Sequence, residues 1–158
     1  MLSKRTEDYL QAIYELSGEK GFTRVKDIAN KLNVKPATVS EMLEKLAREG
    51  YVIYKKRLYV ALTDKGKEVA KCIKERRELL VKFLILLGVP KDIAERDACM
   101  IEHVLHPETV KQLKKFVKFT EECPIKEWLE HFREFCKTGV HPCTVESKVK
   151  LCEHTNLF

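Results

Sequence analysis

The sequence contains no hydrophobic run long enough to cross a lipid bilayer. Its longest apolar stretch, residues 79–89, is interrupted by Lys82 and is shorter than the roughly 20 residues that a membrane-spanning helix needs. The opening residues MLSKRTEDYL lack the apolar core of a secretory signal peptide. These absences argue against a membrane or secreted protein and predict a cytoplasmic one.

The sequence also lacks a large excess of charge of either sign. The formal net charge is +6 and 34% of the residues are charged. This balance fits a soluble protein with an anionic partner, although the excess is too small to prove one. The 158 residues are enough for one large domain or two small ones with a real hydrophobic core.

Two short helices joined by a tight turn are predicted in the first third of the chain, after a first helix over residues 3–17. Apolar residues recur at helical spacing over 25–32 and again over 36–46, and residues 33–35 form the turn between them. This pattern is the helix-turn-helix signature, although a generic helical hairpin has the same periodicity. The residues predicted to contact DNA lie on this second helix or directly before it. They are Lys35, Pro36, Thr38, Ser40, Glu41 and Lys45.

A basic β-hairpin is predicted directly after these helices. Residues 51–54 and 58–62 are β-prone runs, and Lys55, Lys56 and Arg57 lie between them. Consecutive cations at the tip of a hairpin are typical of a wing that contacts DNA phosphates. Residues 63–64 then cap another helix. This order of elements favours nucleic-acid binding.

The segment Asp97–His106 carries four metal-ligand residue types at helical spacing. Cys99, Glu102, His103 and His106 fall at i, i+3, i+4 and i+7, which places them on one stripe of a helix. Such donors suit Fe(II) or Zn(II) better than Ca(II) or Mg(II). The alternative is a solvated polar face with a half-buried cysteine.

A long helix over residues 65–87 and another after residue 107 flank this segment. Three apolar helices beyond a winged helix commonly form a dimer interface, and a dimer matches palindromic operators. Arg77 lies on the apolar stripe of the long helix, so it needs a carboxylate partner if it is buried.

Five segments, in order, resemble the metal-dependent repressors typified by the diphtheria toxin repressor and the manganese-transport repressor: TEDYLQAIYEL, EKLAREGYV, LTDKGKEVA, ERRELLVKFL and ACMIEHVLHPE. The resemblance covers residues 3–119. It implies that a metal bridges the first helix to the helix with the C-x-x-E-H motif, through Asp8, Cys99, Glu102 and His103. Cysteine at position 99 resembles the iron-sensing branch, so Fe(II) is expected, with Mn(II) as the alternative.

The chain departs from this family at its second metal site. The manganese branch has a second carboxylate where this chain has Gln11, and both branches have a histidine where it has Arg77. Further ligands of the iron branch would fall at Val81 and Glu95, and valine cannot ligate. We therefore expect the second site to be lost and Arg77 to replace it by pairing with Glu102 or Glu95.

The remaining residues 120–158 hold four of the six cysteines. In a cytoplasmic protein cysteines indicate metal binding or reactive thiols rather than disulfides, except in hyperthermophiles. A helix is predicted over 125–135, and the tail has little other apolar material, so a bound Zn(II) or iron–sulfur cluster would stabilise it. The alternative is four partly buried cysteines without metal. The candidate ligands are Cys123, Cys136, Cys143 and Cys152.

The predicted fold is mainly α: an N-terminal winged helix-turn-helix (1–64), an α-helical metal-binding and dimerisation domain (65–119) and a cysteine-rich extension (120–158). The predicted function is a metal-responsive repressor of metal homeostasis that binds double-stranded operator DNA as a homodimer, without an enzymatic activity. The alternative is a redox or iron–sulfur-cluster sensor that uses the tail cysteines. A zinc hydrolase is disfavoured because no separate base is evident and the wing would be unexplained.

Overall fold

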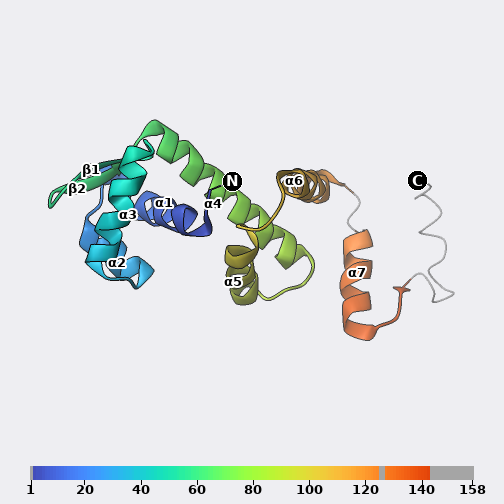
Figure 1. Cartoon of the computed structure of the whole chain (residues 1–158). Coiled ribbons are helices and arrows are strands. Elements are labelled where there is room, and N and C mark those ends of the chain that lie inside the picture. Colours follow the sequence, from blue (N-terminus) through green and yellow to red (C-terminus); the bar gives the residue numbers. More distant parts are fainter. Residues whose placement is uncertain (1, 125–126, 143–158) are drawn as a thin grey trace.

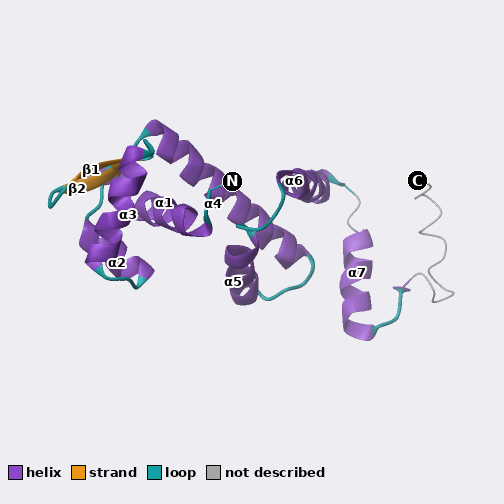
Figure 2. Cartoon of the chain, viewed as in Figure 1, coloured by secondary structure: helices purple, strands orange, loops and turns teal. Residues whose placement is uncertain are grey.

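The computed structural model describes residues 2–124 and 127–142. Figure 2 shows that this part of the chain is mainly helical, with one small antiparallel sheet at one end, far from the last described helix. The mainly α fold with a winged helix-turn-helix is therefore confirmed. The elements are α1 (Lys4–Ser17), the 3-10 helix η1 (Gly18–Lys20), α2 (Val25–Leu32), α3 (Pro36–Arg48), β1 (Val52–Lys55), β2 (Tyr59–Leu62), α4 (Asp64–Leu86), α5 (Lys91–Ile101), α6 (Pro107–Glu122) and α7 (Glu127–Thr138).

The first four helices and the hairpin share one hydrophobic core. The helices α2 and α3 turn the apolar stripes predicted from their spacing toward this core, and α1 adds apolar side chains of its own. Its fully buried large apolar side chains are Leu10, Ile13, Ile28, Val39, Leu43, Leu46 and Val60. The predicted turn between α2 and α3 is confirmed: Asn33 takes the left-handed conformation that ends α2 (φ 52°), and Val34 N–H donates to the carbonyl of Ala29.

The basic hairpin is confirmed, with a small shift of its tip. The strands pair in the register Val52–Leu62 to Lys55–Tyr59. Lys55 therefore ends β1, and the turn consists of residues 56–58, with Arg57 in the left-handed region (φ 66°). Outside these strands, Thr23 forms a single antiparallel bridge with Val60.

The helix α4 begins in tight contact with the hairpin. Thr63 caps it by accepting from Gly66 N–H at 3.1 Å, as the sequence predicted. The same hydroxyl donates to the carbonyl oxygen of Tyr51 at 3.1 Å. A Cβ on Gly66 would lie 2.0 Å from that carbonyl oxygen, so only glycine permits this approach.

The helices α5 and α6 pack along the C-terminal half of α4, away from the hairpin (Figure 1). Phe116 of α6 joins this packing to α7, because its ring contacts both Phe83 of α4 and Trp128 of α7 at centroid distances of 5.9 and 6.3 Å. No helix in the described part of the chain is both long and apolar enough to cross a membrane.

One predicted helix is shorter than its pattern suggested. The helix α5 ends at Ile101, and Glu102 and His103 lie in the turn that follows. His106 precedes Pro107, a position that disfavours the helical conformation, and it has extended backbone angles (ψ 143°). It serves as the N-cap of α6, so the prediction that it shares a helical stripe with the other three residues is wrong.

Candidate metal centre and nucleic-acid interface

His103 is held against α1 by a buried carboxylate. Its Nδ1 lies 2.7 Å from Oε2 of Glu7, and both side chains are almost fully buried. A carboxylate can only accept a hydrogen bond, so Nδ1 donates to Glu7 and Nε2 is the ring atom left to bind a cation. A carboxylate behind the ring in this way is the usual support for a histidine that binds metal.

The Nε2 atom of His103 is buried and has no hydrogen-bond partner. Its nearest polar neighbours are Oδ1 of Asp8 at 3.2 Å and Oε1 of Glu102 at 3.5 Å. Two carboxylate oxygens around a ring nitrogen are a favourable arrangement only when a proton or a metal cation lies between them. Neighbouring ligand atoms around an ion with bonds of about 2.1 Å lie roughly 3 Å apart. Both separations are close to that distance. The three side chains are therefore candidate ligands for a divalent metal ion.

Arg77 of α4 also binds the carboxylate of Glu102. Its Nε and Nη2 donate to Oε2 and Oε1 of the fully buried Glu102, at 3.0 and 2.5 Å. The same Nη2 donates to Oε1 of Gln11 at 2.7 Å and lies 3.4 Å from Sγ of Cys99. Arg77 thus connects α4 with both α1 and α5. The expected pairing with Glu102 is present, whereas Glu95 pairs with Lys91.

The charge of Arg77 does not depend on pH in the range where proteins fold. Burial by itself lowers the pKa of this guanidinium, but the hydrogen bonds to Glu102 and the electrostatic interactions with Glu102, Cys99 and Glu15 outweigh it. The net effect is a pKa above the ordinary arginine value. Arg76 adds a contact to the main chain, because its Nη1 donates to the carbonyl oxygen of Glu102 at 2.8 Å.

The centre carries excess negative charge. Three carboxylates, from Glu7, Asp8 and Glu102, lie within 3.5 Å of His103, and the guanidinium of Arg77 is bonded to one of them. With a neutral imidazole, three minus one leaves two negative charges, which a divalent ion would balance. As it stands, no set of three histidine, cysteine and acidic side chains within residues 2–124 and 127–142 already surrounds an ion position.

The four ligands implied by the family resemblance are therefore only partly brought together. Asp8, Glu102 and His103 converge, whereas Cys99 is half-buried and contacts Arg77. Glu7 was missed in the sequence, because a second acidic residue next to Asp8 gives no signal of its own. Only the fold reveals that Glu7 and Asp8 contact the two different nitrogens of one imidazole.

The predicted DNA-contacting residues of α3 differ in exposure. Lys35, Pro36, Glu41 and Lys45 are exposed, and Thr38 and Ser40 are half-buried. The Ser40 hydroxyl donates to the carbonyl oxygen of Pro36 at 3.1 Å and accepts from the Tyr54 hydroxyl at 3.3 Å. Ser40 therefore connects α3 to the hairpin, a role that helical spacing alone could not reveal.

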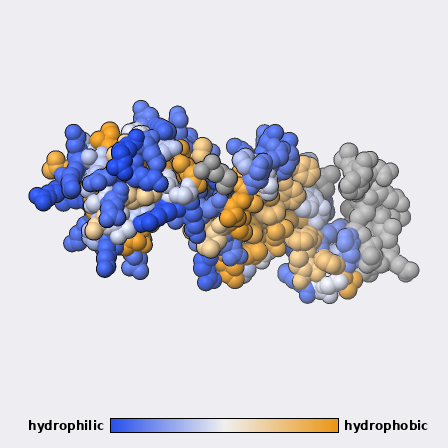
Figure 3. Space-filling model, in the orientation of Figure 1, coloured by the Kyte–Doolittle hydropathy of each residue, from blue (hydrophilic) through white to orange (hydrophobic). Residues whose placement is uncertain are grey.

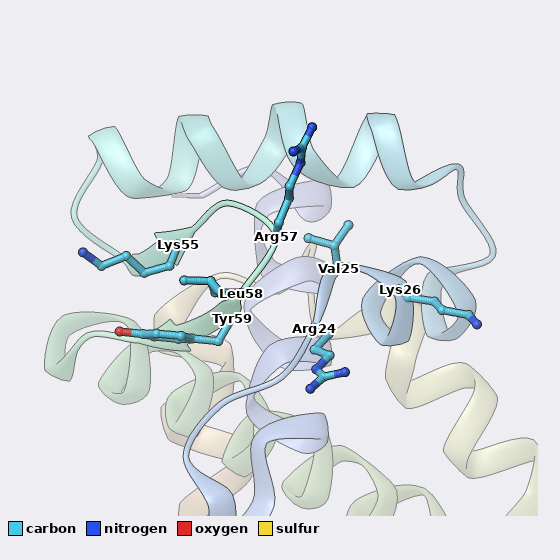
Figure 4. A pocket seen from close by; sticks show the side chains of 7 residues that line it. All are labelled: Arg24, Val25, Lys26, Lys55, Arg57, Leu58 and Tyr59. Atoms are coloured by element: carbon cyan, nitrogen blue, oxygen red, sulfur yellow. The ribbon is translucent and has the colours of Figure 1, made fainter.

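A basic hollow lies between the beginning of α2 and the hairpin (Figure 4). Its apolar lining is Val25, Leu58 and Tyr59, and its cationic lining is Arg24, Lys26, Lys55 and Arg57. The predicted wing cations Lys55, Lys56 and Arg57 are all exposed. Sequence reasoning missed Arg24 and Lys26, which become part of the same basic surface only when α2 packs beside the hairpin.

The candidate metal site in the C-terminal extension is only half visible. Cys143 and Cys152 lie outside the described residues. Cys123 ends α6 and is half-buried, and Cys136 lies on an exposed position of α7. This site therefore stays a prediction.

Two family models match the chain. The iron dependent repressor, N-terminal DNA binding domain matches residues 1–60, and the iron dependent repressor, metal binding and dimerisation domain matches residues 63–127. The HTH-type transcriptional regulator MntR of Bacillus subtilis (strain 168) is 39% identical over 122 residues, which are 77% of this chain and 86% of that protein.

Solved structures agree with these matches. The manganese regulator SloR has a TM-score of 0.63 and 35% identity over 75% of this chain and 56% of its own. ScaR with bound Zn2+ has a TM-score of 0.64 and 30% identity, again over 75% and 56%. The chain thus spans just over half the length of these two proteins. None of these similarities supports the alternative of a redox or iron–sulfur-cluster sensor.

Proposed function

The chain belongs to the iron-dependent repressor family, and on that premise we propose that it is a Mn(II)- or Fe(II)-activated repressor that binds operator DNA as a homodimer. That it is a metal-dependent, DNA-binding transcriptional repressor and no enzyme follows from the family itself. The observation that carries the metal proposal is the buried Nε2 of His103, which has no hydrogen-bond partner and faces oxygens of Asp8 and Glu102. We also propose that the protein acts in the cytoplasm, as predicted from the sequence, because its operator DNA would lie there.

Mn(II) is the metal that the donor set favours first. The atoms that converge on Nε2 are carboxylate oxygens, the ligand type that suits Mn(II). The thiol of Cys99, which favoured Fe(II) on sequence grounds, contacts Arg77 instead. The structural neighbour SloR is a manganese regulator.

The proposed dimer would cover the apolar surface around α4, α5 and α6. Figure 3 shows hydrophobic side chains gathered over this middle part of the molecule, whereas the DNA-binding end is mostly hydrophilic. Such a surface indicates a protein–protein contact. The exposed large apolar residues there are Ile85, Leu87, Ile93, Met100, Val104, Phe116 and Phe119.

The centre lies where the DNA-binding helices meet the dimerisation helices. Glu7 and Asp8 belong to α1, and Glu102 and His103 follow α5. A bound divalent ion would balance the excess negative charge of these carboxylates. Glu7 keeps the imidazole oriented, and the joined side chains fix α1, and with it α3 and the wing, relative to α5. Metal favours the DNA-competent arrangement only to the extent that it binds that arrangement more tightly.

The test uses the full-length chain after metal removal with a chelator. A DNA site is first selected from a random pool in the presence of Mn(II), and affinity is then measured by fluorescence anisotropy with Mn(II), with anaerobic Fe(II), with Zn(II) and without metal. We expect Mn(II) or Fe(II) to tighten binding at least about tenfold, a coupling of typical size. His103→Ala should abolish the effect, whereas the matched control His106→Ala should keep it, because His106 lies outside the centre. Equal affinity under all four conditions would refute metal activation.

A further inference from the structure

Arg77 is surrounded by the kinds of atoms that bind metals. Its guanidinium contacts both carboxylate oxygens of Glu102, the amide oxygen of Gln11 and the sulfur of Cys99. These acceptors come from α1, from α5 and from the turn after α5. The side chain is 27% exposed, and Glu102 is fully buried. A cation is needed here, because a buried carboxylate without a partner is costly.

We infer that Arg77 is a built-in cation that permanently fills one half of a two-cation centre, so that this repressor is activated by a single ion per core. The inference rests on the proposed function for the open half, whose candidate ligands are Asp8, Glu102 and His103. The guanidinium performs in the filled half what a second ion would do, since it joins α1 to α4 and α5 through Gln11 and Glu102.

The two halves share Glu102, so they affect each other. Its Oε1 accepts from Nη2 of Arg77 at 2.5 Å and lies 3.5 Å from Nε2 of His103. An ion in the open half would therefore sit close to a fixed positive charge. Like charges about 5 Å apart repel appreciably even near a protein surface. Arg77 thus weakens metal binding while it preserves part of the helix–helix connection in the absence of metal.

The comparison of Arg77→Met with Arg96→Met tests whether Arg77 links α1 to α4 and α5 in the absence of metal. Arg96 lies on α5 at an exposed position, where it pairs with Asp92 over one helical turn. We expect Arg77→Met to lower the Tm of the metal-free full chain by about 10 °C, because Glu102 loses its partner. Arg96→Met should change the Tm by no more than about 2 °C. Equally small changes of the Tm in both variants would refute this link between the helices.

Calorimetric titration with Mn(II), a metal that thiolate sites bind poorly, tests the single-ion centre. Wild type should bind one Mn(II) per chain. Arg77→Met should bind one with at least about tenfold higher affinity, since the repelling charge is gone. Arg77→His places a ligand where the guanidinium was, and should bind two. Arg77→Lys retains the charge and should still bind one Mn(II) per chain. This variant serves as a second test if Arg77→Met folds poorly.

The outcomes separate this inference from the proposed function. Two Mn(II) per wild-type chain, or a single one in Arg77→His, would refute the built-in cation while metal activation stands. If wild type binds no Mn(II) and its DNA affinity ignores every metal tested, the proposed function fails. The Tm comparison would then still decide whether Arg77 ties α1 to α4 and α5.

Discussion

The hydroxyl of Tyr54 in β1 donates to the hydroxyl of Ser40 in α3 across 3.3 Å. This bond joins the wing to the helix that is predicted to enter the major groove. The two parts of the DNA-binding surface are therefore positioned together, and a change in one is transmitted to the other.

The first prediction separates base contact from positioning at Ser40. If Ser40 acts through Tyr54, then Ser40→Ala and Tyr54→Phe should change DNA affinity equally and leave the preferred sequence unchanged. Thr38, whose hydroxyl makes no such connection to the wing, should alter sequence preference when replaced by alanine. Sequencing of DNA selected by each variant is the measurement. A sequence preference changed by Ser40→Ala but unaffected by Tyr54→Phe would instead assign Ser40 to base recognition.

The second prediction concerns the wing. Replacement of Lys55, Lys56 and Arg57 by alanine should weaken binding to all DNA sequences and flatten the salt dependence, by about 0.9 log units of slope for each lost phosphate contact. The matched control replaces the exposed α6 residues Lys111, Lys115 and Lys118, a change of equal charge away from the wing. An equal loss of slope in both triple variants would indicate a general charge effect instead of a wing contact.

The third prediction concerns the basic hollow beside the wing. The double variant Arg24→Ala/Lys26→Ala should also flatten the salt dependence of DNA binding. The slope should fall by up to about 1.8 log units if each side chain contacts one phosphate. The reason is that both cations line the hollow with Lys55 and Arg57. Lys20→Ala, at an exposed position in η1, serves as the control. An unchanged slope in the double variant would place the DNA backbone elsewhere.

The fourth prediction tests the support of His103. Glu7→Gln keeps the shape of the side chain but removes its charge, so the imidazole is held less firmly. We expect the affinity for Mn(II) to fall about 10- to 100-fold, as for other residues that orient a metal-binding histidine. Glu19→Gln, at an exposed position in η1, should leave it unchanged. Calorimetry gives both values, and similar affinities for the two variants would exclude a supporting role for Glu7.

The fifth prediction concerns the contact between α4 and the hairpin. Alanine in a helix is ordinarily about 1 kcal/mol more favourable than glycine. At Gly66 the added Cβ would lie 2.0 Å from the carbonyl oxygen of Tyr51, so Gly66→Ala should instead destabilise the protein, by about 1–3 kcal/mol. Urea denaturation measures the change, with the neighbouring Lys67→Ala as a near-neutral control. A stabilised Gly66→Ala variant would show that the helix can move away from the hairpin.

Periodicity and caps were sufficient to predict most of the fold. The stripes of α2 and α3, the cap at Thr63 and the two β-prone runs are local signals, and each appears where it was expected. The failure at His106 has a local cause that was also available, since the following proline disfavours helical geometry at that position.

The centre was less predictable, because its contacts join residues far apart in the sequence. Glu7 and His103 are separated by 96 positions, and nothing in either segment indicates that one supports the other. The inward position of Arg77 could be predicted from its helical stripe. Its contacts with Gln11 and Cys99 depend on how three helices pack, which no local pattern determines.

The helix α4 has a mechanical consequence for the whole molecule. One end is fixed to the wing at Gly66, and Arg77 lies about 16 Å further along the axis at 1.5 Å per residue. Between Lys67 and Leu86 it contains neither glycine nor proline, so nothing in its sequence provides a hinge. It therefore acts as a stiff lever arm. A tilt of only about 10° about Arg77 would carry the wing sideways by about 3 Å, comparable to the spacing between successive base pairs.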